Sequence, residues 1–213
     1  MSALTAVAAQ SEADAVRLIT LGAHNVSVTG NLKFDVAPPE ESREDGLALR
    51  TLFGKRRPVF LAASTRECEE ALILEAVRGL KVLTVIVPRH PQRFNAVATL
   101  LAEEDFSFVR RSAIATQVER NVQVVLGDSM GEMFSYYAAC DFTFVGGSLL
   151  DFGGQNIIEP ATMGKPILIG QHTFNFAEAS ANAIAIGAAI QVGDAADLRQ
   201  QISSLLQNSV QRS

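Results

Sequence analysis

Two junctions in this 213-residue sequence combine glycines with polar side chains in a way that suits the binding of phosphate groups. Residues 153–156 read Gly-Gly-Gln-Asn and lead into a helical pattern at Ile157, and residues 127–132 read Gly-Asp-Ser-Met-Gly-Glu. Glycine permits positive φ angles and lets a ligand come close to the backbone. A helix N-terminus after it offers free N–H groups and the positive end of a dipole to an anion. The junctions indicate an anion or nucleotide site, with ordinary helix starts as the alternative.

A third junction, Pro88-Arg89-His90-Pro91, places an arginine directly after an expected strand. A guanidinium there would point into the crevice at the strand ends, where it suits contacts with phosphate and base carbonyl oxygens. The alternative is an arginine exposed on a loop. For His90 we favour the simpler interpretation, a residue that precedes a helix starting at proline.

Glutamates recur three residues after a hydroxyl or amide side chain at several of these junctions. This spacing is that of a capping box, in which the first side chain accepts a bond from a helix N–H group and the glutamate reaches back. Each pair taken alone is more typical of a helix start than of a ligand site. The pairs are Ser64 and Glu67, Ser129 and Glu132, Asn156 and Glu159, and Asn175 and Glu178.

Composition and charge argue against several other classes of function. The net charge of −5 does not provide the basic face of a general nucleic-acid binder. The basic cluster Lys55-Arg56-Arg57 is interpreted as a solvated connection, although such clusters also mark anionic partners. Neither a GxGxxG nor a Walker A pattern occurs, and no apolar run approaches the ~20 residues of a membrane span. Reduced thiols and no metal site are expected, because cysteine and histidine are scattered: Cys68, Cys140, His24, His90 and His172.

A frame of strands and helices must position these junctions. From Pro58 onward, apolar runs alternate with helical patterns, which predicts a parallel sheet covered on both faces. The expected fold class is therefore α/β, a doubly wound parallel sheet of Rossmann type, in which ligands bind beyond the carboxyl ends of the strands. The expected strands are Val59–Ala63, Lys81–Val87, Val122–Leu126, Phe142–Val145, Pro166–Ile169 and Ala189–Val192. The expected helices are Glu67–Arg78, Pro91–Glu103, Met130–Ala139, Ile157–Met163, Phe174–Ile186 and Ala195–Leu206.

The first 42 residues have a different character. Residues 4–9 are expected to form a strand and residues 11–21 an amphipathic helix, followed by an acidic, proline-rich stretch at 35–42. We interpret residues 1–42 as the tail of a preceding N-terminal domain with its linker, and residues 43–213 as a Rossmann-like domain. A short helix over residues 46–53 is expected to lead into it.

Together, the junction segments resemble one family, the 3-deoxy-D-manno-octulosonic acid (Kdo) transferases of lipopolysaccharide synthesis. The resemblance runs in order over nearly the whole chain, and its segments are specific as a set rather than singly. Two departures stand out, Cys68 where the family usually has glycine and Gln171 where proline is usual. The segments that carry the resemblance are residues 28–35, 62–67, 87–91, 127–132, 144–149, 153–160 and 172–176.

The resemblance implies the C-terminal half of a GT-B glycosyltransferase, which binds CMP-Kdo for inverting transfer of Kdo to a lipid A precursor. It implies no bound metal or other cofactor and no nucleic-acid partner. The general base is expected in a preceding half, so this chain alone is expected to be an inactive, soluble fragment. The full-length protein is expected on the cytoplasmic side of the bacterial inner membrane. An alternative is the nucleotide-binding half of a UDP-sugar-dependent GT-B transferase or epimerase.

The resemblance also implies site residues for the CMP moiety. Arg89 would supply positive charge, Pro88 would pack beside the base, and Glu159 would accept bonds from two ribose hydroxyls, as a two-oxygen carboxylate can. The backbone at Met130-Gly131-Glu132 and at the helix following Asn156 would supply N–H groups for the phosphate. The expected CMP-binding set is Pro88, Arg89, Met130, Gly131, Glu132, Asn156, Ile157, Ile158 and Glu159, with Ser64, Gly154 and His172 as further candidates.

Overall fold

The computed structural model describes residues 3–31 and 34–208, which fall into two compact units divided between Ala37 and Pro38. We call these the N-terminal unit and the main unit. The assignment of residues 1–42 to a preceding domain stays a prediction. Over the described residues, no helix has the length and apolar character needed to cross a membrane.

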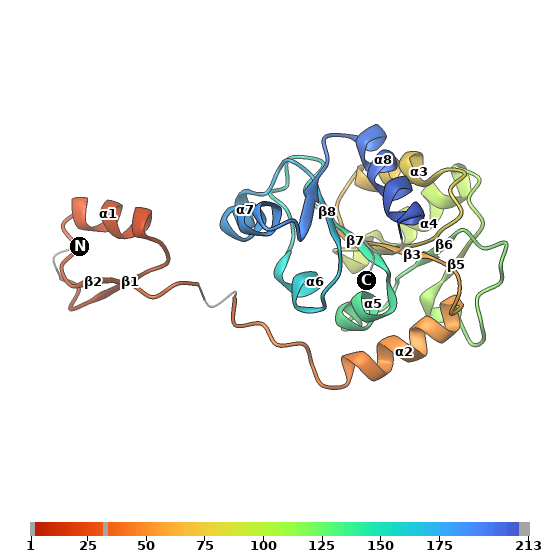
Figure 1. Ribbon diagram of the computed structural model, residues 1–213, viewed down its shortest axis with the longest axis horizontal. Helices are drawn as coiled ribbons and strands as arrows, with labels where there is room; N and C mark the ends of the chain where they lie inside the picture. Colours follow the sequence, from red (N-terminus) through yellow and green to blue (C-terminus); the bar gives the residue numbers. More distant parts are fainter. Residues whose placement is uncertain (1–2, 32–33, 209–213) are drawn as a thin grey trace. The chain divides into compact units, whose positions relative to one another are not determined.

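The N-terminal unit is a single strand–helix–strand repeat (Figure 1). Strand β1 (Val7–Ala9) pairs in parallel with β2 (Val26–Val28), and helix α1 (Glu12–Thr20) connects them. The Ser11 side chain caps α1 by accepting a bond from the backbone N–H of Asp14 at 3.2 Å. The strand and the helix expected here from the sequence are both confirmed.

Within the described part of the main unit, one parallel sheet of seven strands runs in the order β5-β6-β4-β3-β7-β8-β9. The chain moves outward from β3 to β4 and β5, returns to β6, and then crosses to β7 on the other side of β3. This change of direction between β3 and β7 is the switch point at which doubly wound sheets bind ligands. The strands are β3 (Val59–Thr65), β4 (Leu83–Pro88), β5 (Phe108–Arg110), β6 (Val124–Leu126), β7 (Phe142–Val145), β8 (Ile167–Ile169) and β9 (Ala189–Gln191).

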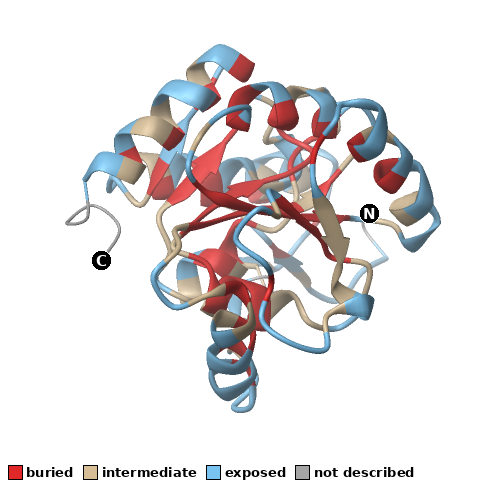
Figure 2. Ribbon diagram, turned by 90° about the vertical axis from the view of Figure 1, so that its right-hand side faces the viewer, coloured by how far each residue is buried: buried red, intermediate tan, exposed pale blue. Residues whose placement is uncertain are grey.

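Successive side chains of the central strand β3 point to opposite faces of the sheet, and each face has its own hydrophobic core. Phe60 and Ala62 belong to a core shared with helices α3, α4 and α8, and Leu61 and Ala63 belong to a core shared with α2 and α5. Figure 1 shows these two groups of helices on opposite sides of the sheet, and Figure 2 colours the strands between them mostly as buried. The predicted doubly wound sheet is thus confirmed. The helices are α2 (Ser42–Phe53), α3 (Glu69–Val77), α4 (Phe94–Glu103), α5 (Met133–Ala139), α6 (Ile158–Thr162), α7 (Ala177–Ala185) and α8 (Ala195–Gln207).

Several expected boundaries are wrong. Helix α5 begins at Met133 rather than Met130, because residues 129–132 form a loop in which Gly131 has a φ of 82°. Strand β5 and the 3-10 turn η3 (Arg111–Ala113) were not expected. Helix α2 begins at Ser42 and contains Gly46, where a Cβ would collide with the side chain of Ala138 on α5. That glycine is needed because the two helices pack closely.

Candidate functional site

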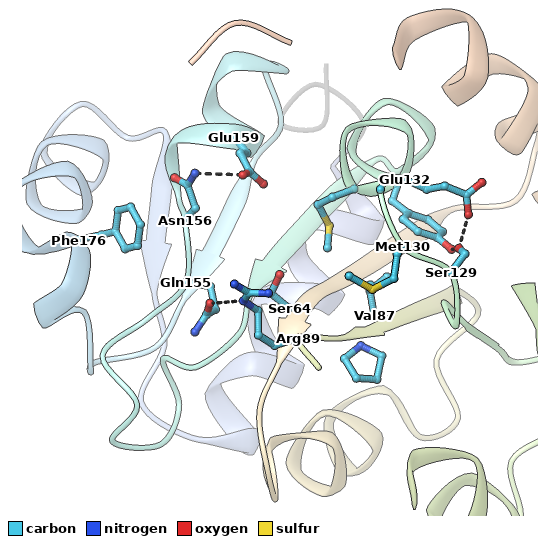
Figure 3. Close-up of a pocket in the computed structure, with 14 residues that line it drawn as sticks. Ser64, Val87, Arg89, Ser129, Met130, Glu132, Gln155, Asn156, Glu159 and Phe176 are labelled. Carbon is cyan, nitrogen blue, oxygen red and sulfur yellow. Dashed lines mark hydrogen bonds between the residues drawn. The ribbon is translucent and has the colours of Figure 1, made fainter. Parts of the chain in front are cut away.

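A cavity of about 470 Å³ opens at the carboxyl ends of the central strands, where the three junctions meet (Figure 3). The end of β3 contributes Ser64, the end of β4 contributes Pro88 and Arg89, and the segment after β6 contributes residues 129–133. From the opposite side, the loop after β7 contributes Gln155 and Asn156, and helix α6 contributes Glu159. The complete lining is Ser64, Val87, Pro88, Arg89, Ser129, Met130, Gly131, Glu132, Met133, Tyr136, Gln155, Asn156, Glu159 and Phe176.

Most of the expected site residues meet in this cavity. Two others, Ile157 and Ile158, are buried next to it and do not line it. Gly154 and His172 also lie outside the lining, and the Nδ1 atom of His172 faces a carboxylate oxygen of Asp151 at 3.4 Å. The expected residues that line the cavity are Ser64, Pro88, Arg89, Met130, Gly131, Glu132, Asn156 and Glu159.

Arg89 projects into the cavity and is held by Gln155. The Nε atom of Arg89 donates to Oε1 of Gln155 at 3.1 Å, and Figure 3 shows this bond between the two side chains. The bond uses one edge of the guanidinium and leaves the two Nη groups for another partner. Gln155 is itself fixed because its backbone N–H donates to the carbonyl of Gly146 at 2.9 Å. Gln155 was not among the expected site residues, although it stands inside the glycine junction.

Glu159 and Asn156 form the opposite wall, at the start of α6. The backbone N–H of Ile158 donates to Oδ1 of Asn156 at 3.0 Å, and the side-chain amide of Asn156 donates to Oε1 of Glu159 at 3.1 Å. A capping box would instead direct the glutamate to the backbone N–H of Asn156, so this pair resembles one only in part. Burial raises the pKa of Glu159, while the bond from Asn156 and the charge of Arg89 act in the opposite direction.

This geometry changes the expected source of N–H groups for a phosphate. Helix α6 has a single turn, the N–H of Ile158 is already bonded to Asn156, and Pro160 has none. Its N-terminus therefore offers fewer free donors than the sequence pattern suggested. The cation of Arg89 becomes the main positive group of the cavity.

The third wall is the loop between β6 and α5. The Ser129 hydroxyl donates to Oε2 of Glu132 and lies 3.1 Å from the Tyr136 hydroxyl, while the guanidinium of Arg111 donates to Oε1 of Glu132 at 2.8 Å. The Ser129 side chain does not cap α5, which has no side-chain cap. Glu132 is therefore already paired on both of its carboxylate oxygens. Burial raises the pKa of Tyr136, which keeps its hydroxyl protonated at the cavity floor.

The unexpected η3 turn holds this loop in place. Asp128 accepts bonds from the backbone N–H of Ser112 at 2.9 Å and from its hydroxyl at 2.7 Å, and Arg110 lies 3.5 Å from the same carboxylate. Together with the pair between Arg111 and Glu132, these contacts fasten both ends of the loop at residues 128–132 to β5 and η3. The sequence signal for this role was the adjacent pair Arg110-Arg111, next to a serine.

A buried glutamate organises the opposite loop. Glu69 is fully buried, and its carboxylate accepts four backbone N–H bonds at 2.6–3.0 Å. Burial raises the pKa of Glu69, whereas the four N–H donors lower it. The carboxylate thus joins the start of α3 to the turn after β7, whose glycine carbonyls hold residues 154 and 155. The donors are Arg66, Gly147, Ser148 and Leu149.

The fourth expected capping pair, Asn175 and Glu178, has another role. Asn175 directs its side-chain amide to the carbonyls of Phe152 and Gly154, at 3.0 and 3.4 Å. It therefore fastens the 3-10 turn η4 (Phe174–Phe176) to the glycine loop, and η4 contributes Phe176 to the cavity. The remaining pair, Ser64 and Glu67, does not cap α3, which begins two residues after Glu67.

Comparisons with known proteins agree with this fold. The family model described as "Glycosyl transferases group 1" matches residues 60–213, and the model described as "3-Deoxy-D-manno-octulosonic-acid transferase (kdotransferase)" matches residues 1–36. The crystal structure of the C-terminal CMP-Kdo binding domain of WaaA from Acinetobacter baumannii has a TM-score of 0.76 and 31% identity. The match covers 82% of this chain and 93% of that domain. The chain belongs to the Kdo transferase family.

Curated Kdo transferases extend the similarity beyond this domain. The 3-deoxy-D-manno-octulosonic acid transferase of Bordetella pertussis is 44% identical over 92% of this chain, and that of Haemophilus influenzae is 40% identical over 98%. The chain spans about half the length of these relatives, 47% and 50% respectively. Anabaena HepE in complex with UDP-glucose shares only the fold, with a TM-score of 0.58 at 15% identity. The predicted fold class, the C-terminal half of a GT-B glycosyltransferase, is confirmed.

One departure from the expected Kdo transferase pattern lies in a strained backbone conformation. Cys68 precedes α3 with a φ of 67°, in the left-handed region that favours glycine. The glycine that is usual in the family would adopt this conformation without strain. The thiol is exposed and does not line the cavity.

Proposed function

We propose that this chain binds CMP-Kdo and supplies the donor side of a Kdo transferase, which moves Kdo to a lipid A precursor in lipopolysaccharide synthesis. The observation that carries the proposal is the cavity at the strand ends, in which eight of the expected nucleotide-binding residues meet. The likeness to a CMP-Kdo binding domain over 93% of its length supports the same donor.

The cavity provides contacts suited to a nucleoside monophosphate. Arg89 offers the two Nη groups that its bond to Gln155 leaves free, and a guanidinium binds phosphate oxygens in pairs. Across the cavity, Glu159 has an oxygen beyond the one that accepts from Asn156, and we assign it to the ribose hydroxyls. Pro88 and Met130 provide an apolar surface for the base.

In the proposed reaction the acceptor hydroxyl attacks the anomeric carbon of Kdo with inversion. The bond from that carbon to the phosphate oxygen breaks, and its electron pair leaves with CMP. Arg89 stabilises the negative charge that develops on the phosphate, a contribution that is large when the charge is preorganised. The hydroxyl proton passes to a base that we do not assign to this chain, because Glu132 is paired with Arg111 and Ser129 and we give Glu159 to the ribose.

Calorimetric titration of this chain with CMP, UMP and AMP tests the proposal. We expect CMP to bind more tightly than UMP and AMP. Binding of UMP with equal or higher affinity would favour the alternative, a UDP-sugar-dependent enzyme. We place the complete reaction at the cytoplasmic face of the bacterial inner membrane and assign no metal or other cofactor to it.

A further inference from the structure

A second cavity, of about 650 Å³, lies away from the donor cavity. It is formed by the end of α2, by the turn at residues 54–57 and by the segment at residues 117–120. The backbone N–H of Val118 donates to the carbonyl of Leu52 at 2.8 Å and so joins two of these walls. Because β3 begins at Val59, this cavity lies at the amino end of the central strand, opposite the edge at which Arg89 lies.

The charged side chains that line this second cavity are mostly cations. They include Lys55, Arg56, Arg57 and Arg120, against the single acidic residue Glu119. Over the part of the chain that the structure describes, the ion pairs found within 4.0 Å include none of these five residues. Positive charge is therefore concentrated here in a chain whose net charge is −5. We call this cavity the basic pocket.

Arg57 is the partly buried cation of the group, whereas Lys55, Arg56 and Arg120 are exposed. Its guanidinium is partly buried, and its Nη2 atom donates to the carbonyl of Val122, but its Nη1 atom is buried without a hydrogen-bond partner. Burial lowers the pKa of Arg57, as expected for a cation without a counter-ion. An anion beside the guanidinium would supply the missing counter-charge and so offset the cost of partly burying this cation.

We propose that the basic pocket binds a phosphate-type anion. A group with two or more negative charges matches the excess of positive charge in the basic pocket. The guanidinium groups of its arginines and the ammonium group of its lysine can all donate hydrogen bonds to phosphate oxygens. The chemistry is the same for a free phosphate or pyrophosphate and for the phosphate of a lipid headgroup. This site is independent of the donor cavity, so CMP titrations do not decide it.

Pyrophosphate titration by calorimetry tests the proposal at about 0.15 M salt, where distant charges are largely screened. The test protein carries Lys55→Gln, Arg56→Gln and Arg120→Gln, which change exposed side chains and keep Arg57 and its bond to Val122. The control protein removes the same number of exposed cations elsewhere, through Arg17→Gln, Arg43→Gln and Lys81→Gln. Both are compared with a reference protein that has neither set of changes, and all three proteins carry Arg89→Gln to weaken binding in the donor cavity.

We expect the test protein to bind pyrophosphate at least about 10-fold more weakly than the control, because charge-assisted bonds are lost from one site. Equal affinity in the two proteins would overturn the proposal, since the attraction would then follow net charge alone. The proposal would also be overturned if the reference protein showed no saturable binding of pyrophosphate and no retention on the acidic vesicles described next.

Co-sedimentation with vesicles distinguishes the two sources of phosphate. Vesicles of phosphatidylcholine are compared with vesicles that also contain phosphatidic acid. Retention on the acidic vesicles by the control protein but not by the test protein would indicate a lipid headgroup. Pyrophosphate binding without vesicle retention would indicate a free phosphate.

Discussion

Replacing Glu159 by glutamine separates a ligand role from a structural one. The carboxylate accepts one bond from the side-chain amide of Asn156 at 3.1 Å, and its pKa is raised by burial. Glutamine has nearly the same size, and its amide oxygen can accept the same bond. It also removes a charge that is costly to bury. We therefore expect the free energy of unfolding to change by less than about 0.5 kcal/mol, a shift of roughly 1–2 °C in Tm.

The effect on nucleotide binding should be larger. A carboxylate that accepts bonds from two ribose hydroxyls makes charge-assisted contacts, each worth roughly 1.5–3 kcal/mol. Glutamine keeps one acceptor oxygen and loses the charge. We expect the affinity for CMP to fall at least about 10-fold, equivalent to 1.4 kcal/mol. Calorimetric titration and thermal unfolding on one preparation measure both quantities.

Glu178→Gln is the matched control, because Glu178 is an exposed glutamate in the first turn of α7 and lies outside the cavity. It should change neither the Tm nor the affinity for CMP. A fall in Tm for Glu159→Gln with unchanged CMP affinity would refute the reasoning, and Glu159 would then be a structural residue of α6.

The pH dependence gives a second readout of the same residue. Since the pKa of Glu159 is raised in the folded protein, the ionised acceptor forms only as the pH rises through that raised value. The ratio of wild-type to Glu159→Gln affinity for CMP should therefore increase with pH and then level off; titration of the CMP phosphate is common to both proteins. In the ligand-free protein, the stabilising contribution of the raised pKa is present below the ordinary glutamate pKa and is lost as the pH rises through the folded one. A ratio that does not change with pH would contradict this assignment.

Three further predictions concern residues around the cavity. Glu69→Gln should lower the free energy of unfolding, measured in urea titrations, by about 2 kcal/mol or more. Two of the four buried N–H groups lose their acceptor oxygen, and each loss costs about 1–3 kcal/mol. A loss no larger than that of Glu67→Gln would contradict this prediction. Cys68→Gly should raise the free energy of unfolding by up to about 1 kcal/mol, since glycine adopts the left-handed conformation without strain. Cys68→Ala should not raise it. Gln155→Ala should weaken CMP about 3–10-fold by releasing Arg89, a loss of about one hydrogen bond. Calorimetry should show the affinity for cytidine, which lacks the phosphate, unchanged; an equal loss for both ligands would show that Gln155 does not act through the phosphate.

The sequence predicted the frame of the main unit well because the evidence for it is local. The run Val59–Ala63 is apolar on both faces, which is typical of a strand in a sheet covered on both sides. The placement of Arg89 after β4 and of Asn156 before α6 followed from the same pattern. Strand β5 was missed because it has only three residues, and its two apolar residues are followed at once by Arg110, so the run is too short to stand out in the sequence.

Side-chain partners far apart in the chain could not be predicted in the same way. The spacing of Ser129 and Glu132 fits a capping box, but the structure brings Arg111 to Glu132 and moves the helix start to Met133. The partners of Glu69 lie 78–80 residues away, apart from Arg66. A glutamate near a helix start looks the same in sequence whether it is solvated or fully buried.

The contacts of Glu69 have a consequence for the amide protons of the turn after β7. Gly147, Ser148 and Leu149 belong to no helix or strand, yet each donates its N–H to a carboxylate that is fully buried. Such protons exchange with solvent only when the carboxylate is released, which requires the start of α3 to separate from the sheet. Deuterium should therefore enter this turn as slowly as it enters β3 and β7, before any nucleotide is added. One wall of the donor cavity would then be preformed, and its ordering would cost little of the energy of binding.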